Sequence, residues 1–153
     1  MKRFIIYTLF ICAAFSTLAQ GWQYKGDDAL LASNDNYITG DFDKPTRLCI
    51  FVGYDRENDI EHVVMLLQGE CDISNFRQNQ MYVVVSFDYE KEQRWRIKKE
   101  KVNGNEFAAF SIVNTTAFIK HLQNAESIRV TLPIFQQGTQ TFYFSANGYP
   151  LDW

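Results

Sequence analysis

The side chains best suited to metal or nucleophilic chemistry are few and widely separated. The chain contains two histidines, His62 and His121, and neither has a second histidine or a Cys-x-x-Cys pair at ligand spacing. Zinc sites in proteins are built from three or four such ligands at short, regular spacings. A cysteine nucleophile paired with either histidine would require a meeting in space that no sequence spacing predicts. The sequence therefore predicts no metal site and no cofactor.

Carboxylates offer a second kind of chemistry. Asp88, Glu90 and Glu92 follow one another at the end of an apolar run. Two carboxylates at a strand end could perform acid–base chemistry on a sugar, which would make the protein a small hydrolase using Asp88 with Glu90 or His62. A solvated rim of charges explains the same residues without catalysis, and we favour that interpretation. Enzymatic activity stays the alternative hypothesis.

A basic stripe is the third candidate. Arg94, Arg96 and Lys98 alternate with Trp95 and Ile97, as expected for one solvent-facing side of a strand. Their pattern predicts a surface that contacts a protein or an anionic glycan, although a solvated outer sheet face also explains the charges.

Phe107 is expected on the same face as this stripe, across a hairpin whose turn contains Asn103-Gly104. An aromatic residue on a solvent-facing side is not needed for solubility, so we include Phe107 in the predicted binding site.

The first residues have the pattern of a secretory signal peptide. Lys2 and Arg3 precede an apolar run over 4–18, and Thr17 and Ala19 provide small residues at a cleavage site after Ala19. A helix over 4–19 would reach only about 24 Å, short of a hydrocarbon core of about 30 Å, so a membrane anchor is disfavoured. We therefore expect a periplasmic or secreted protein with no stable membrane span after cleavage.

Residues 20–153 then form a single domain of ordinary size. The whole chain carries a formal net charge of −3, and removal of Lys2 and Arg3 makes the mature domain more acidic. An acidic domain is poorly suited to nucleic acid, so no nucleic-acid partner is expected.

Export also permits a disulfide between Cys49 and Cys71. If the segments around the turn at 55–58 form a hairpin, Cys49 faces roughly Val64, and Cys71 lies beyond the strand end at Gly69. At about 3.3 Å per residue that separation is outside disulfide reach unless the chain folds back. Both outcomes stay open.

Alternating apolar residues predict a mainly β fold. The central strand is 81–89, in which Met81, Val83, Val85, Phe87 and Tyr89 share one face. We expect an antiparallel β-sandwich or flattened barrel of seven or eight strands with one short α-helix near 115–124, capped by Asn114. The other strands are expected near 22–25, 47–54, 59–68, 93–101, 106–113, 127–135 and 140–147.

Turn residues predict the pairing of two hairpins. The Asn103-Gly104 turn should pair Ile97 with Phe110, and a three-residue loop over 137–139 should pair Val130 with Ala146. Pro133 lacks an amide donor, so the strand over 127–135 should lie near an edge of the sheet.

The order of these elements resembles a group of small exported bacterial β-sandwich proteins. The matching segments are Trp22, Leu48-Cys49-Ile50, Val85-Ser86-Phe87-Asp88, Trp95, Phe118-Ile119-Lys120-His121-Leu122, Phe142-Tyr143-Phe144 and Gly148. The chain thereby resembles the invasion-associated locus B family and the type VI secretion accessory family, although Ser86 stands where those families usually have arginine. The resemblance implies a non-enzymatic accessory role in the cell envelope or outside the cell.

The sequence therefore favours an exported, non-enzymatic binding module of the bacterial envelope. It would contact a protein or glycan through the stripe of Arg94, Arg96 and Lys98 with Phe107. The alternatives are a small secreted hydrolase and an inhibitor or immunity protein that binds one secreted partner.

Overall fold

The computed structural model describes residues 21–36, 46–68, 81–102 and 107–151. The leader, Cys71 and the Asn103-Gly104 turn lie outside the described residues, as does the side chain of Phe107. The described elements are β1 (Trp22–Lys25), β2 (Asp28–Ala32), β3 (Arg47–Asp55), β4 (Ile60–Gln68), β5 (Tyr82–Phe87), β6 (Gln93–Glu100), β7 (Phe107–Ile112), α2 (Thr115–Leu122), β8 (Ser127–Ile134) and β9 (Gly138–Ser145).

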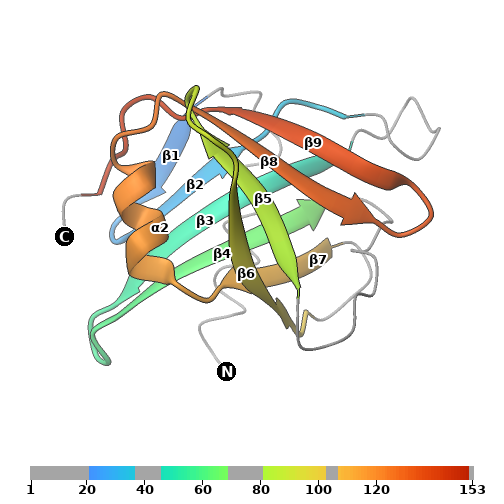
Figure 1. The fold of residues 1–153 in the computed structure, drawn as a ribbon. Coiled ribbons are helices and arrows are strands. Elements are labelled where there is room, and N and C mark those ends of the chain that lie inside the picture. The colour runs from blue at the N-terminus through green and yellow to red at the C-terminus, as the bar shows by residue number, and fades with distance from the viewer. Residues whose placement is uncertain (1–20, 37–45, 69–80, 103–106, 152–153) are drawn as a thin grey trace.

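All nine described strands belong to one antiparallel sheet with the order β1-β2-β3-β4-β7-β6-β5-β8-β9. The sheet curls into a half-barrel, with β1 to β4 behind and β5, β6, β8 and β9 in front, and α2 lies at one end (Figure 1). A mainly β fold with one short helix is thus confirmed. The described residues form nine strands, more than the predicted seven or eight, because the N-terminal segment forms the hairpin of β1 and β2 instead of one strand.

The extra hairpin is explained by a two-residue turn. Lys25 pairs with Asp28, which leaves Gly26 and Asp27 as the connection. Gly26 has φ +63°, a left-handed conformation that glycine adopts without a steric cost. Gly-Asp between two short strands is a recognised hairpin signal, and it would have predicted this turn from the sequence.

The interior is filled by alternate residues of the curled sheet. On β5, Val83, Val85 and Phe87 are buried, while Tyr82 on the other face is exposed, as the alternation predicts. Tyr89 departs from the prediction: it is fully exposed, because the strand ends at Phe87. The helix adds its apolar side to the same interior through Phe118, Ile119 and Leu122.

The helix begins as its cap residue predicts. The side chain of Asn114 accepts a hydrogen bond from the backbone N–H of Ala117. Such a cap satisfies one of the N–H groups that a helix leaves unpaired at its first turn. The helix ends at Leu122, two residues before the predicted limit at Asn124.

Two hairpins pair two residues away from their predicted register. Cys49 pairs with Leu66 in place of Val64, and Ile97 pairs with Ile112 in place of Phe110. In the first hairpin the loop is Arg56–Asp59, and Asp59 takes a left-handed φ of +54° that completes the turn. Because both shifts are even, every side chain stays on its predicted face.

The last hairpin differs by four residues. Val130 pairs with Phe142 in place of Ala146, since the loop is 135–137 and not 137–139. Gln136 and Gly138 have φ values of +60° and +71°, so the reversal occurs before the glycine that we expected at its centre. Pro133 of β8 pairs with Thr139 of β9. The pairing between β8 and β5 ends at Thr131, so the absence of a backbone N–H at Pro133 costs no hydrogen bond to β5.

The two ends of the sheet approach each other along β9. Three hydrogen bonds join the N-terminal segment to β9 and the residue that follows it: Asn34 N–H to Tyr143 O at 3.0 Å, Asn36 Nδ2 to Thr141 O at 2.9 Å, and Trp22 Nε1 to Ala146 O at 2.9 Å. We call this contact line the seam.

Within the residues described, no helix has the length and apolar character required to span a bilayer.

Candidate functional site

The predicted basic stripe lies on the outer face of β6. Arg94, Arg96 and Lys98 are exposed there, and Trp95 and Ile97 between them point into the core. None of the three cations has a hydrogen bond or an ion pair with another described residue. Surface cations without partners keep their full charge available to a ligand.

The backbone of Phe107 lies beyond one end of this stripe. It pairs with Gln68 of β4 and lies at the start of β7, before the residues 109–112 that pair with β6. Lys98 pairs with Ser111, four residues along β7 from Phe107, which corresponds to about 13 Å of extended chain. Arg94 and Arg96 lie further along β6, so the strand pairing places the backbone of Phe107 nearest to the Lys98 end of the stripe.

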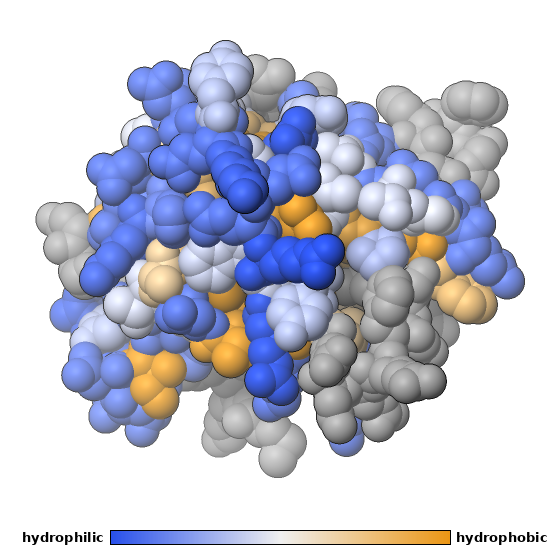
Figure 2. Space-filling model, in the orientation of Figure 1, coloured by the Kyte–Doolittle hydropathy of each residue, from blue (hydrophilic) through white to orange (hydrophobic). Residues whose placement is uncertain are grey.

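Exposed tyrosines lie on the same side of the sheet as the stripe. Tyr82 of β5 pairs directly with Arg96 and is 43% exposed, and Tyr143 of β9 pairs with Arg129 of β8 and is 54% exposed. We call this surface the arginine–tyrosine face; its members are Arg94, Arg96, Lys98, Tyr82, Arg129 and Tyr143. The side of the molecule that carries β5, β6 and β8 is mostly hydrophilic, with apolar surface in small separate patches (Figure 2).

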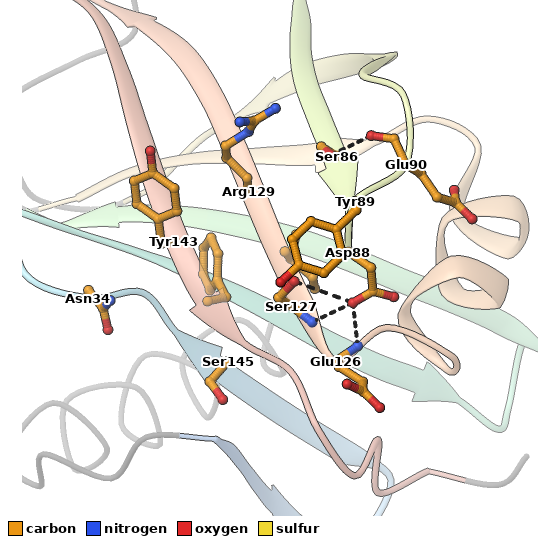
Figure 3. Close-up of a pocket in the computed structure, with 12 residues that line it drawn as sticks. Asn34, Ser86, Asp88, Tyr89, Glu90, Glu126, Ser127, Arg129, Tyr143 and Ser145 are labelled. Carbon is orange, nitrogen blue, oxygen red and sulfur yellow. Dashed lines mark hydrogen bonds between the residues drawn. The ribbon is translucent and has the colours of Figure 1, made fainter.

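A groove of about 550 Å³ lies at one end of this face, beside the seam (Figure 3). Its walls come from the turn after β5, the start of β8, and β9. The polar and aromatic residues that line it are Asn34, Ser86, Asp88, Tyr89, Glu90, Glu126, Ser127, Arg129, Tyr143, Phe144 and Ser145.

Asp88 fastens the turn after β5 to the start of β8. Its Oδ1 accepts hydrogen bonds from the backbone N–H groups of Glu126 at 2.9 Å and Ser127 at 2.8 Å, and from the Ser127 hydroxyl at 3.3 Å. Asp88 N–H in turn donates to Ser127 O at 2.8 Å. The carboxylate that the hydrolase hypothesis requires is thus engaged in holding the backbone.

The same turn is held from its other side. The buried Ser86 hydroxyl donates to Glu90 O at 2.8 Å, and Glu90 N–H donates to Phe87 O at 3.0 Å. Asp88 has φ +52°, a left-handed conformation that costs free energy for a non-glycine residue. Between these fixed points Tyr89 projects fully into solvent.

The groove contains more negative than positive charge. Arg129 Nη2 is bound to Glu92 Oε1 at 2.9 Å, which neutralises the only cation among the described lining residues. Glu126 is exposed, and Glu90 Oε2 lies 4.0 Å from His121 Nδ1. His121 stacks on Phe87, with ring centroids 4.7 Å apart, so this histidine belongs to the aromatic packing under α2.

The remaining candidates for chemistry do not converge on the groove. His62 is exposed on β4, which β7 and β6 separate from β5 in the sheet, and it does not line the groove. Cys49 is fully buried, and burial raises the pKa of its thiol to about 12, although Arg47 acts in the opposite direction. A neutral, buried thiol is a poor nucleophile. Its pairing with Cys71 falls outside the described residues.

In the described part of the chain, no three histidine, cysteine or carboxylate side chains cluster in a way that could hold a metal ion.

The residues of the face and groove that were not predicted as site residues include Arg129, Tyr143, Tyr82 and Tyr89. Arg129 and Tyr143 carry the same alternating signal as Arg94, because each lies between two buried residues of its strand. That signal could have found them. Tyr89 could not be found in this way, because the alternation places it inside.

Comparison with known proteins adds no assignment: no protein-family model, no curated protein and no solved structure matches the chain.

Proposed function

We propose that the protein is an exported, non-enzymatic binding module of the bacterial envelope or the extracellular space, and that it contacts a protein or glycan through the arginine–tyrosine face. The leader pattern, with cleavage after Ala19, supports export. The resemblance to exported accessory proteins supports the same role. The engagement of Asp88 in backbone hydrogen bonds argues against the hydrolase alternative.

One observation carries this proposal: exposed tyrosines share one side of the sheet with Arg94 and Arg96, which form no ion pair within the described part of the chain. Arg96 and Tyr82 are direct cross-strand neighbours, and neither is needed by the core. Tyrosine and arginine are enriched at binding surfaces, because each combines a large contact area with a polar or charged end. A face maintained only for solubility has no need of tyrosines.

The test is capture of a partner by tagged, mature protein from the envelope and culture fluid of the source organism. The variant Arg94→Ala/Arg96→Ala removes two exposed cations of the face. We expect it to weaken binding at least about tenfold, since truncating important interface residues costs more than about 1.4 kcal/mol. Binding by the parent should also weaken as salt is raised, because screening acts on exposed charges.

The matched control is Arg56→Ala/Lys120→Ala, which removes the same charge from exposed positions outside the face. It should bind like the parent. Equal binding by the Arg94/Arg96 variant and the parent would contradict the proposal. Capture of one secreted protein in a tight one-to-one complex would favour the inhibitor or immunity alternative, and absence of any partner would direct attention to hydrolase assays.

A further inference from the structure

We infer that the groove beside Tyr89 is a carbohydrate subsite that takes neutral sugar residues. The inference rests on the proposed function and narrows it, because it names a ligand class for one end of the arginine–tyrosine face. It uses the groove lining, of which Arg94 and Arg96 are not members.

The chain holds Tyr89 in a turn that is fixed on both sides. Asp88 adopts a left-handed backbone and accepts three hydrogen bonds, and Ser86 and Phe87 anchor Glu90 on the other side. All of these contacts fix a turn whose central side chain is fully exposed. A rigidly presented aromatic residue contributes nothing to the core, but it loses little conformational entropy when a ligand covers it.

Tyr89 and Tyr143 flank the groove as a pair. Tyr143 comes from β9 and Tyr89 from the turn after β5, so that β8 runs between them (Figure 3). Two strand spacings, about 10 Å, separate β9 from β5, and Tyr143 lies level with Ser86 of β5, three residues before Tyr89. A pyranose ring has an apolar C–H face and polar edges, and tyrosine likewise combines an apolar ring with a polar hydroxyl. The two rings can therefore contact separate residues of one sugar chain.

The polarity of the lining favours a neutral ligand. Glu90 and Glu126 supply acceptors, and Asn34 and Ser145 supply neutral donors and acceptors, all at exposed positions. Sugar hydroxyls can bond to groups of both kinds. An anionic ligand would be repelled by the two carboxylates, because Arg129 is already bound to Glu92. A cationic ligand is the competing occupant, because Glu90 and Glu126 would attract it, and the test below distinguishes the two.

The size of the groove suits a small ligand. Its volume of about 550 Å³ lies within the range of roughly 300–1,000 Å³ that is usual for small-ligand sites. Such a volume accommodates a short stretch of a sugar chain and not a folded partner. An acidic polysaccharide would need cations that the groove does not leave free.

The test is affinity electrophoresis in native gels that contain one soluble neutral polysaccharide each: β-glucan, xylan, galactomannan or dextran. We expect at least one of them to retard the mature parent protein. The variant Tyr89→Ala/Tyr143→Ala should lose the retardation, and it should fold normally because both side chains are exposed, which circular dichroism checks. The matched control is Tyr24→Ala, an exposed tyrosine of β1 outside the groove, and it should be retarded like the parent.

No retardation in any of the four gels would overturn the inference, and so would equal retardation of the parent and the Tyr89/Tyr143 variant. Binding of a fluorescent oligolysine peptide that depends on the two tyrosines would overturn it in favour of a cationic ligand. The two proposals can fail separately, because the gels test Tyr89 and Tyr143 whereas partner capture tests Arg94 and Arg96. If retardation requires the two tyrosines but partner capture does not require the two arginines, the sugar subsite is supported and the proposed role of the arginines in partner binding is refuted.

Discussion

Two polar atoms inside the protein have no hydrogen-bond partner among the described residues: Trp95 Nε1 and the Tyr149 hydroxyl. Both belong to rings that pack edge to face, Trp95 on Phe118 with centroids 4.9 Å apart and Tyr149 on Trp22 at 5.2 Å. Leaving a buried donor unpaired costs roughly 1–3 kcal/mol. The packing of the two rings must outweigh that cost, which means that shape determines these positions more than hydrogen bonding does.

Replacing Tyr149 by phenylalanine tests this interpretation. Tyr149→Phe keeps the ring against Trp22 and removes the unpaired hydroxyl, so we expect the free energy of unfolding at neutral pH to be unchanged or to rise by about 1 kcal/mol. Urea denaturation measures it. The control is Tyr24→Phe on the exposed side of β1, which should leave stability unchanged. A loss of stability in Tyr149→Phe would show that the hydroxyl has a partner.

The same variant has a predicted pH dependence. Burial, reinforced by the nearby Glu61 carboxylate, raises the pKa of the Tyr149 hydroxyl above its usual range. The unfolded chain therefore releases this proton near pH 10, before the folded chain does, and folding stability falls as pH rises from there toward the folded pKa. Tyr149→Phe removes that loss, so its advantage over the parent should grow above about pH 10.

At the scale of elements, the sequence predicted which face of the sheet most side chains occupy, but it did not predict the register in which the strands pair. Alternation determines which side chain points inward, and a shift of two or four residues preserves that parity. The outward position of Arg94 and Arg96 was therefore correct although their hairpin pairs two residues away from expectation. Which residues become cross-strand neighbours depends on where a turn closes, and left-handed residues such as Asp59 and Gln136 carry no strong sequence signal.

The position of the groove was also not predictable from the sequence, because it depends on strand register. Its position depends on the pairing of Arg129 with Tyr143, which the expected register of the last hairpin did not contain. It also depends on Asp88, whose left-handed backbone ends β5 and turns Tyr89 outward. Strict alternation continues through Asp88 and places Tyr89 in the core. The backbone N–H groups of Glu126 and Ser127 donate hydrogen bonds to Asp88 and hold the turn in this conformation. These residues are far from Asp88 in the sequence, so no local sequence pattern predicts the contact.

Substitutions of Asp88 measure how much this turn contributes. Asp88→Asn keeps an acceptor oxygen and a residue that tolerates the left-handed region, so it should cost less than about 1 kcal/mol. Asp88→Ala leaves two backbone N–H groups without their acceptor and should cost roughly 2–3 kcal/mol. Urea denaturation of both variants provides the comparison. Equal stability of the two variants would mean that the carboxylate does not hold the turn and that Tyr89 is not rigidly presented.

At the scale of the whole molecule, the seam decides whether the curled sheet behaves as one unit. Most strands of the sheet pair with a strand that is next to them in the sequence. Without long-range contacts, the N-terminal and C-terminal halves of the sheet could therefore open separately. The contacts that oppose such opening join residues far apart in the chain, above all Trp22 and Ala146. The groove lies beside this line, with Asn34 in its lining and bound to Tyr143 O. Closure of the sheet therefore also shapes the candidate sugar site.

Trp22→Phe tests that coupling. It keeps an aromatic ring beside Tyr149 but removes the hydrogen bond from Trp22 Nε1 to Ala146 O, so the free energy of unfolding should fall by about 1 kcal/mol. If the seam joins the two ends cooperatively, hydrogen exchange will quicken in β9 as well as in β1. Tyr24→Phe, on the same strand and exposed, should change neither. Faster exchange confined to β1 would mean that the first strand frays alone, so that the groove is shaped by the Asp88 turn and β9 without help from the N-terminal strand.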